Sequence, residues 1–259
     1  PKPQTPNPKP QTPNPLFTNA DKLIKIIFKQ IEFEFKRKLL LAAIMELDDA
    51  QYRIKYILVG SPFVGKSSII WRFTRDSFIE DYKSTLGVEF ATKNIKLSDN
   101  SVVKAQIWDT AGHELYRSVT KSYFRNIAIA LLVFDLGKSD SLMNLESWLK
   151  EIKTIASDKV TLVLVGNKLD LDDDITVDLA MARRFAEENG MQFFEASAKT
   201  GQNISSIFAR SAEEVMQKVK DGVVDPSNDT HGVKSLGLAH SLNNLKRKST
   251  IFIQKKCCR

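Results

Sequence analysis

Short apolar runs alternate with longer segments of helical period along the central part of the chain. Four runs predict β-strands: RIKYILVG, VVKAQIWD, IALLVFD and VTLVLVGN. Three segments repeat apolar residues every three or four positions and predict helices: 141–156, 177–189 and 203–220. Strands that alternate with helices in this way form mostly parallel sheets with helices on both faces. We therefore expect an α/β fold.

The two ends of the chain have a different pattern. KPQTPNP occurs twice in tandem near the start, and the apolar residues that follow are interrupted by charges too often for a membrane-spanning helix. We expect residues 1–44 to be an N-terminal extension outside the working protein, with an amphipathic membrane anchor as the alternative. We expect a folded domain over residues 45–220 and, from the polar DGVVDPSNDTHG onward, a flexible tail over 221–259.

Charge and cysteine content narrow the class of protein. The net charge is +7, but residues 1–44 and 221–259 hold 15 of the 38 basic and 6 of the 31 acidic residues, so the middle is close to neutral. A folded body without a basic stripe argues against a nucleic-acid partner. The two cysteines are Cys257 and Cys258, so no disulfide framework is expected and a reducing compartment is favoured.

Candidate chemistry begins directly after the first predicted strand. GSPFVGKS, residues 60–67, fits the phosphate-binding pattern G-x-x-x-x-G-K-[ST] and precedes a helical segment. In such a loop backbone N–H groups surround phosphates, Lys66 reaches the terminal ones, and Ser67 binds magnesium through its hydroxyl. Asp109 ends the strand VVKAQIWD, where a carboxylate can hold the same cation.

A base-recognition element follows another apolar strand. In NKLD, residues 167–170, the carboxylate of Asp170 can accept hydrogen bonds from the ring N–H and the exocyclic amine of guanine. Adenine has no such pair of donors, so it would leave a buried acceptor unpaired. The prediction is a guanine nucleotide rather than an adenine nucleotide, which disfavours an ATPase or a kinase.

These segments together resemble the small GTPases of the Ras superfamily, and within it the Rab family. GSPFVGKS, TLGVEF, WDTAG, NKLD and EASAK occur in the family's order and spacing, and the resemblance covers about residues 51–220 and extends through the tail. TLGVEF, YRSVTKSYFRN and LLVFDL are similar to Rab segments, and GVEF together with RSVTKSYFRN is most similar to the subgroup that acts at endosomes and the Golgi. The resemblance implies a P-loop small GTPase fold with a six-stranded sheet, which binds GTP or GDP and Mg²⁺.

The resemblance also assigns roles to individual residues. It implies that Thr85 binds magnesium and senses the γ-phosphate, that Gly112 donates its N–H to that phosphate, and that Phe78 packs against the guanine. The full set assigned to cofactor binding is Ser61, Phe63, Val64, Gly65, Lys66, Ser67, Ser68, Phe78, Tyr82, Thr85, Gly112, Asn167, Lys168, Asp170, Ser197, Ala198 and Lys199, with Ser67, Thr85 and Asp109 on the metal and Lys66, Thr85, Gly112 and His113 in catalysis.

Three aromatic residues match a surface that Rab proteins present to effectors. They are Phe90, Trp108 and Tyr123. A plain core cluster is the alternative, because aromatic residues at strand and helix positions usually pack for stability.

Two positions depart from the family pattern. His113 stands where the family has a glutamine that orients the attacking water; a neutral imidazole can accept from water but is shorter. We interpret His113 as a residue at a catalytic position and not as a metal ligand. Pro62 and Phe63 replace small residues of the phosphate loop, which predicts retained binding but slow unassisted hydrolysis.

The resemblance implies a GTP-dependent switch in vesicle trafficking, with a poorly hydrolysing, GTP-bound membrane adaptor as the alternative. Its implied partners are an exchange factor, an activating protein, an escort protein, a dissociation inhibitor and effectors, and the protein is expected to be a monomer. The ending KKCCR is similar to Rab endings that carry two prenyl groups on Cys257 and Cys258. The expected location is the cytoplasmic face of an endosome or Golgi membrane, with a cytosolic pool.

Overall fold

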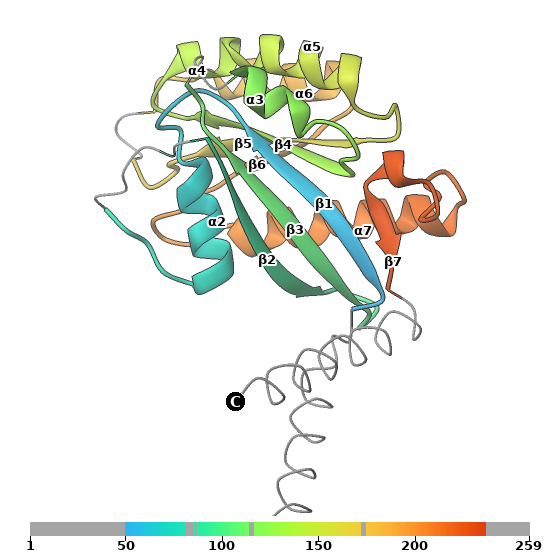
Figure 1. Ribbon diagram of the computed structural model, residues 1–259. Helices are drawn as coiled ribbons and strands as arrows, with labels where there is room; N and C mark the ends of the chain where they lie inside the picture. The colour runs from blue at the N-terminus through green and yellow to red at the C-terminus, as the bar shows by residue number, and fades with distance from the viewer. Residues whose placement is uncertain (1–49, 81–84, 86, 114–116, 172–174, 237–259) are drawn as a thin grey trace, which may run out of the picture. The chain divides into compact units, whose positions relative to one another are not determined.

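The computed structural model describes residues 50–80, 85, 87–113, 117–171 and 175–236, and its main element is a twisted sheet (Figure 1). Six strands have the order β2-β3-β1-β4-β5-β6. Every neighbouring pair on this path is parallel except β2 and β3, which are antiparallel. The predicted six-stranded, mostly parallel sheet is confirmed. The strands are β1 (Tyr52–Val59), β2 (Val88–Lys96), β3 (Val102–Thr110), β4 (Ile129–Asp135), β5 (Thr161–Asn167) and β6 (Gln192–Glu195).

Helices cover both faces of the sheet, as predicted (Figure 1). α2 (Lys66–Arg75) and α7 (Ile204–Lys220) lie on one face, and α3 (Arg117–Ser122), α4 (Ser139–Met143), α5 (Leu145–Ile155) and α6 (Leu179–Glu188) lie on the other. The segment predicted as one helix over 141–156 is two helices that adjoin at Asn144. No helix among the described residues combines the length and the apolar character needed to cross a bilayer.

The alternation of side chains along β1 explains why the sheet needs helices on both sides. Tyr56 and Leu58 point into the core under α2 and α7, and Ile57 points into the core on the opposite face. The Tyr56 hydroxyl is fully buried and donates to the carbonyl oxygen of Phe208 at 3.0 Å, so this polar group is satisfied within the core. β4 and β5 are buried at every position, as central parallel strands require.

The expectation of a flexible segment from residue 221 onward is wrong for residues 221–236. A 3-10 helix, η3 (Asp229–His231), leads into a seventh strand, β7 (Val233–Ser235), which pairs antiparallel with the first residues of β1. The physical reason lies in β1 itself: β4 pairs with it only from Tyr56 onward, so its first residues have an open edge that β7 occupies. Val233 is fully buried there.

This packing predicts that Val233→Asp destabilises the domain. A carboxylate at a fully buried, apolar position is left without a compensating partner, which should lower the free energy of unfolding by about 3 kcal/mol or more. Urea unfolding followed by circular dichroism measures the change. Ser235→Asp is the matched control, since Ser235 is exposed on the same strand. Equal stability of the two variants would contradict the packing of β7.

Candidate functional site

A cavity of about 380 Å³ lies at the carboxyl ends of the strands. Its walls are the segments that follow β1, β3, β5 and β6 and the segment between α2 and β2, although these are far apart in the sequence. The convergence is a property of parallel sheets, whose loops at one edge gather around one crevice. The predicted site residues that line it are Phe63, Gly65, Lys66, Ser67, Ser68, Phe78, Thr85, Gly112, His113, Asn167, Lys168, Asp170, Ala198 and Lys199.

The loop between β1 and α2 has the close backbone packing that its glycines permit. A Cβ at Gly60 would lie 2.1 Å from the carbonyl oxygen of Val133, and one at Gly65 would lie 2.2 Å from Asn167 Nδ2. Both glycines have positive φ angles, which side chains disfavour. The loop can therefore follow this tight path into α2. The first N–H groups of a helix have no partner within the helix, so the start of α2 can bind an anion.

Lys66 is buried against this loop. Its Nζ donates to the carbonyl oxygens of Gly60 and Ser61, each at 2.9 Å. Burial lowers the pKa of Lys66 to about 8, an effect that the nearby Asp109 carboxylate partly opposes. A buried ammonium group of this kind is stabilised by a further anion, and phosphate is the anion that such a loop accommodates.

Three oxygen-bearing side chains meet beside Lys66. Ser67 Oγ lies 2.6 Å from Thr85 Oγ1, Ser67 donates to Asp109 Oδ2, and Thr85 Oγ1 lies 3.4 Å from the same carboxylate oxygen. The other oxygen, Asp109 Oδ1, is buried and makes no hydrogen bond within the described residues. Burial raises the pKa of Asp109 to about 6, and the hydroxyl of Ser67 and the charge of Lys66 oppose this rise. Hard oxygen ligands with an unpaired carboxylate oxygen fit Mg²⁺.

The segment after β5 forms the other end of the cavity. Asp170 Oδ1 accepts from the buried Ser197 hydroxyl at 2.5 Å, which fixes the carboxylate. Asn167 is buried and joins two loops: its Nδ2 donates to Val64 O at 2.9 Å and its Oδ1 accepts from the Ala198 N–H at 3.1 Å. This end of the cavity is thus a rigid acceptor site of the kind that the pair of donors on guanine requires.

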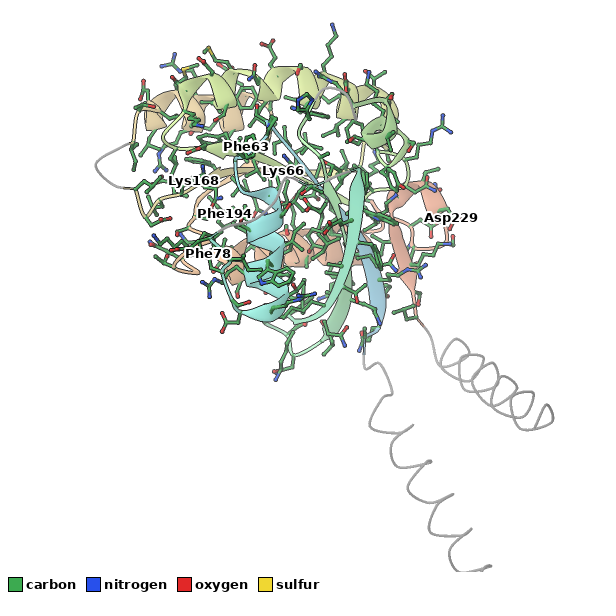
Figure 2. All side chains as sticks on the ribbon, turned by 60° about the vertical axis from the view of Figure 1, so that its left-hand side comes forward. Phe63, Lys66, Phe78, Lys168, Phe194 and Asp229 are labelled. Carbon is green, nitrogen blue, oxygen red and sulfur yellow. The ribbon has the colours of Figure 1, made fainter. Side chains whose placement is uncertain are left out.

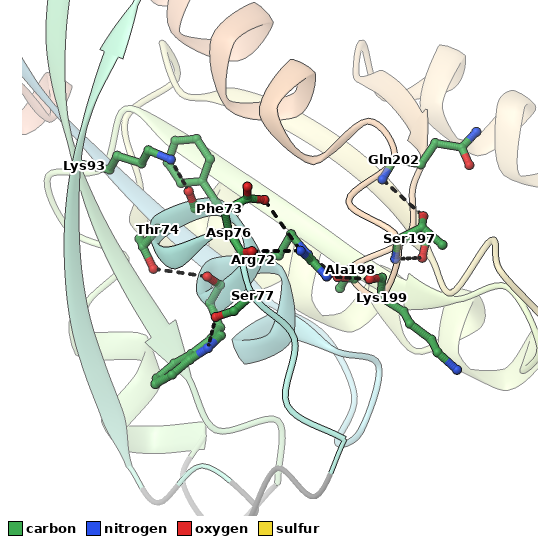
Figure 3. Close-up of polar contacts among 12 residues, drawn as sticks. Arg72, Phe73, Thr74, Asp76, Ser77, Lys93, Ser197, Ala198, Lys199 and Gln202 are labelled. Carbon is green, nitrogen blue, oxygen red and sulfur yellow. Dashed lines mark hydrogen bonds and ion pairs between the residues drawn. The ribbon is translucent and has the colours of Figure 1, made fainter.

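Two supporting residues were not found by sequence reasoning. Asp135, at the end of β4, is buried and pairs with Lys168, whose Nζ lies 2.7 Å from Asp135 Oδ2. Arg72 on α2 donates from Nε to Ala198 O at 2.9 Å and from Nη2 to Lys199 O at 2.5 Å, as Figure 3 shows. Arg72 thereby ties the loop after β6 to α2. A single arginine on a helix has no sequence signal for such a contact.

Some predicted residues lie elsewhere or act through their backbone. Val64 is buried, so its carbonyl and not its side chain takes part. Ser61 borders a neighbouring cavity, and its hydroxyl accepts from Asn144 Nδ2 at 3.3 Å. Ser197 supports Asp170 from within the core. Tyr82, Cys257, Cys258 and residues 1–44 lie outside the described residues.

The two departures from the family pattern both lie at the rim of the cavity. His113 is exposed there, next to Gly112, where a Cβ would lie 2.5 Å from Lys66 Nζ. Phe63 has a φ of 62° and its side chain is 71% exposed. Figure 2 labels Phe63 together with Lys66, Phe78 and Lys168 on this side of the molecule.

The three aromatic rings predicted as a surface are in contact with one another. The ring centroids of Phe90 and Trp108 are 4.8 Å apart, and those of Trp108 and Tyr123 are 5.0 Å apart. Lys55 Nζ lies 5.4 Å from the centroid of Trp108. Phe90 is 51% exposed, whereas Trp108 and Tyr123 pack partly against the core. The cluster therefore combines core packing with an accessible ring.

Comparison with known proteins agrees with this geometry. The sequence model of the Ras family matches residues 55–217. The chain is also 40% identical over 215 residues to the GTP-binding protein ypt3 of Schizosaccharomyces pombe, a match that covers 82% of this chain and 98% of the relative.

Proposed function

Because the chain belongs to the Ras family of small GTPases, we propose that it is a Rab-type switch that binds GTP and GDP with Mg²⁺ and hydrolyses GTP. One observation carries the proposal: a buried lysine, the hydroxyls of Ser67 and Thr85 with Asp109 in contact with both, and the fixed carboxylate of Asp170 meet at a single cavity. The assignment to Rab proteins is supported by the 40% identity to ypt3 across most of both chains and by the Rab-like segments around Phe90 and Tyr123.

Each group has a defined part in binding. The Lys66 ammonium neutralises the terminal phosphates while loop N–H groups donate to them. Asp170 accepts hydrogen bonds from the guanine. Asn167 bonds to Val64 of the phosphate loop and to Ala198 of the loop after β6, and so fixes these two loops relative to each other. Mg²⁺, held by Ser67, Thr85 and Asp109, would neutralise the charge that develops between the outer phosphates. Thr85 and Gly112 contact the γ-phosphate, and these contacts order the segments around the two residues. Hydrolysis removes the γ-phosphate and releases the segments, which is the basis of the switch.

Hydrolysis depends on the residue that orients the attacking water. His113 is exposed at the rim next to Gly112, so its ring can reach water at the phosphate end. A neutral imidazole has one acceptor and one donor nitrogen, but they point away from each other on a short side chain, whereas the oxygen and nitrogen of a glutamine amide share one terminal carbon on a longer side chain. We therefore expect slow intrinsic turnover, and a nearly non-hydrolysing GTP-bound adaptor is the second candidate function.

His113→Gln should raise the intrinsic hydrolysis rate roughly tenfold, because the longer side chain brings an acceptor and a donor on one terminal carbon to the attacking water, which the divergent nitrogens of an imidazole do not. Single-turnover GTP hydrolysis on the purified chain, with and without an activating domain of the Rab type, measures the change. His231→Gln is the matched control, since His231 lies in η3 and not at the cavity. A variant no faster than the wild type would show that His113 already orients the water or that the phosphate loop sets the rate. If the wild-type chain does not hydrolyse GTP even with the activating domain, the second candidate function, a GTP-bound adaptor, is favoured.

We further propose that the protein acts in vesicle trafficking on an endosomal or Golgi membrane. Its regulators would be those of the Rab type, and effectors would dock on the cluster of Phe90, Trp108 and Tyr123. Prenyl groups on Cys257 and Cys258, aided by the basic residues near them, would hold it at the membrane, since two chains give stable attachment where one does not.

The membrane proposal predicts that the double variant Cys257→Ser, Cys258→Ser moves from the membrane fraction to the cytosol. GTP binding should stay unchanged, because the described residues that line the cavity all lie between Pro62 and Lys199. Fractionation of cells that express each form, followed by immunoblotting, measures the distribution. Persistent membrane association of the double variant would contradict lipid attachment at these residues.

A further inference from the structure

Phe63 has a backbone conformation and a degree of exposure that are both unfavourable for a phenylalanine. Its φ of 62° is in the left-handed region, which costs a residue with a Cβ on the order of 1 kcal/mol relative to glycine. Its ring is also 71% exposed, although burial of a phenylalanine ring is strongly favourable. Backbone strain of this kind is concentrated at binding sites, where a ligand makes use of the conformation.

The position of Phe63 points to the ligand that covers it. Phe63 lines the cavity together with other apolar side chains, among them Phe78, Ile79 and Leu171. The hydrogen bond from Asn167 Nδ2 to the carbonyl of the next residue, Val64, holds this part of the loop against the segment after β5. Phe63 therefore lines the same cavity as Lys66 and Asp170, and the residue after it is bonded to the segment that carries Asp170.

The part of a nucleotide that joins its phosphates to its base is the sugar. We propose that the Phe63 ring closes over the sugar of the bound guanine nucleotide and slows its release. The inference rests on the proposed function and makes Phe63 a positioning residue for the nucleotide. When a nucleotide is bound, the ring can pack against the carbon atoms of the sugar. The left-handed backbone conformation directs the side chain to the mouth of the cavity instead of into the core.

The test is the dissociation rate of tritium-labelled GDP from the full chain, measured by filter retention after addition of excess unlabelled GDP. A fluorescent group on the sugar is avoided because it would occupy the contact under test. Phe63→Ala and Phe63→Gly should both release GDP about tenfold faster than the wild type, and Phe63→Tyr should release it at the wild-type rate. Met181→Ala, which removes a 49% exposed side chain from α6, should leave the rate unchanged.

The comparison of alanine with glycine separates the ring from the backbone, since alanine retains the left-handed strain and glycine relieves it. Equal acceleration in both supports the ring contact. Acceleration in the glycine variant alone, unchanged rates in both variants, or slower release would overturn the inference. If the wild-type chain retains GDP but the variants match it, the inference fails while the proposed function stands. If the wild type retains no GDP, both are overturned.

Discussion

Asp170→Asn should lower the affinity for GDP on the order of 10³-fold. The carboxylate can accept two charge-assisted hydrogen bonds from guanine. An amide can accept only one, and its NH2 group then faces the other N–H donor of guanine. The Ser197 hydroxyl, which donates to Asp170 Oδ1 at 2.5 Å, can still donate to the amide oxygen, so the fold should be retained. Xanthine has a carbonyl where guanine has its amine, and the variant should therefore bind xanthosine diphosphate more tightly than GDP.

Isothermal titration calorimetry with GDP, ADP and xanthosine diphosphate tests this expectation. Asp158→Asn is the matched control, because Asp158 is an exposed carboxylate that does not line the cavity. An Asp170→Asn variant that still prefers GDP would show that the base is recognised by other groups.

Lys66→Ala should reduce the affinity for GDP and GTP by at least about 10²-fold. The ammonium is buried beside the phosphate loop, and each charge-assisted hydrogen bond to a phosphate oxygen is worth about 1.5–3 kcal/mol. Removal of the side chain also leaves the carbonyl oxygens of Gly60 and Ser61 without their donor, which should loosen the loop itself. GTP should lose more affinity than GDP, since the lysine reaches the terminal phosphates.

The same calorimetric titration measures the loss, with Lys150→Ala on the exposed side of α5 as the matched control. Circular dichroism must show that the Lys66→Ala variant is folded. A folded variant with unchanged affinity for both nucleotides would remove the phosphate loop from the proposed site.

The parts of the fold that could be predicted are those whose signal is local. IALLVFD is apolar at every position except its final aspartate, and β4 has the same limits, Ile129–Asp135. The helix predicted over 203–220 is α7, because a long amphipathic period is decided within the segment itself. The cavity could be anticipated for a related reason: loops at the carboxyl ends of parallel strands must meet.

The features that could not be predicted depend on contacts between distant residues. β7 has only three residues, and its pairing exists because β4 leaves the start of β1 uncovered. A short polar segment that contains one valine has no strand pattern of its own. Similarly, nothing in the sequence around Arg72 indicates its hydrogen bonds to Ala198 and Lys199, which lie more than a hundred residues away.

Phe63 shows a limit of a different kind. The sequence indicated a bulky residue in a loop that needs small ones, from which we expected slow hydrolysis. The structure places the ring at the mouth of the cavity and exposed, so the loop accommodates it by adopting a left-handed backbone conformation. The direction of a side chain in a loop is set by φ and ψ, which composition does not reveal.

The pairing of β7 with β1 determines how the domain responds to mechanical tension. β7 is antiparallel to β1, and the N–H of Leu236 donates to the carbonyl of Gln51 at 2.8 Å. A pull on the chain beyond Leu236 is borne first by that bond and then by the pairs from Ser235 back to Val233, one after another, as in the opening of a zipper. Because the load reaches the pairs singly, β7 should yield at low force while β1, β3 and β4 stay paired. A protein tethered through its tail would then lengthen at this strand without disturbing the cavity at the opposite end of β1.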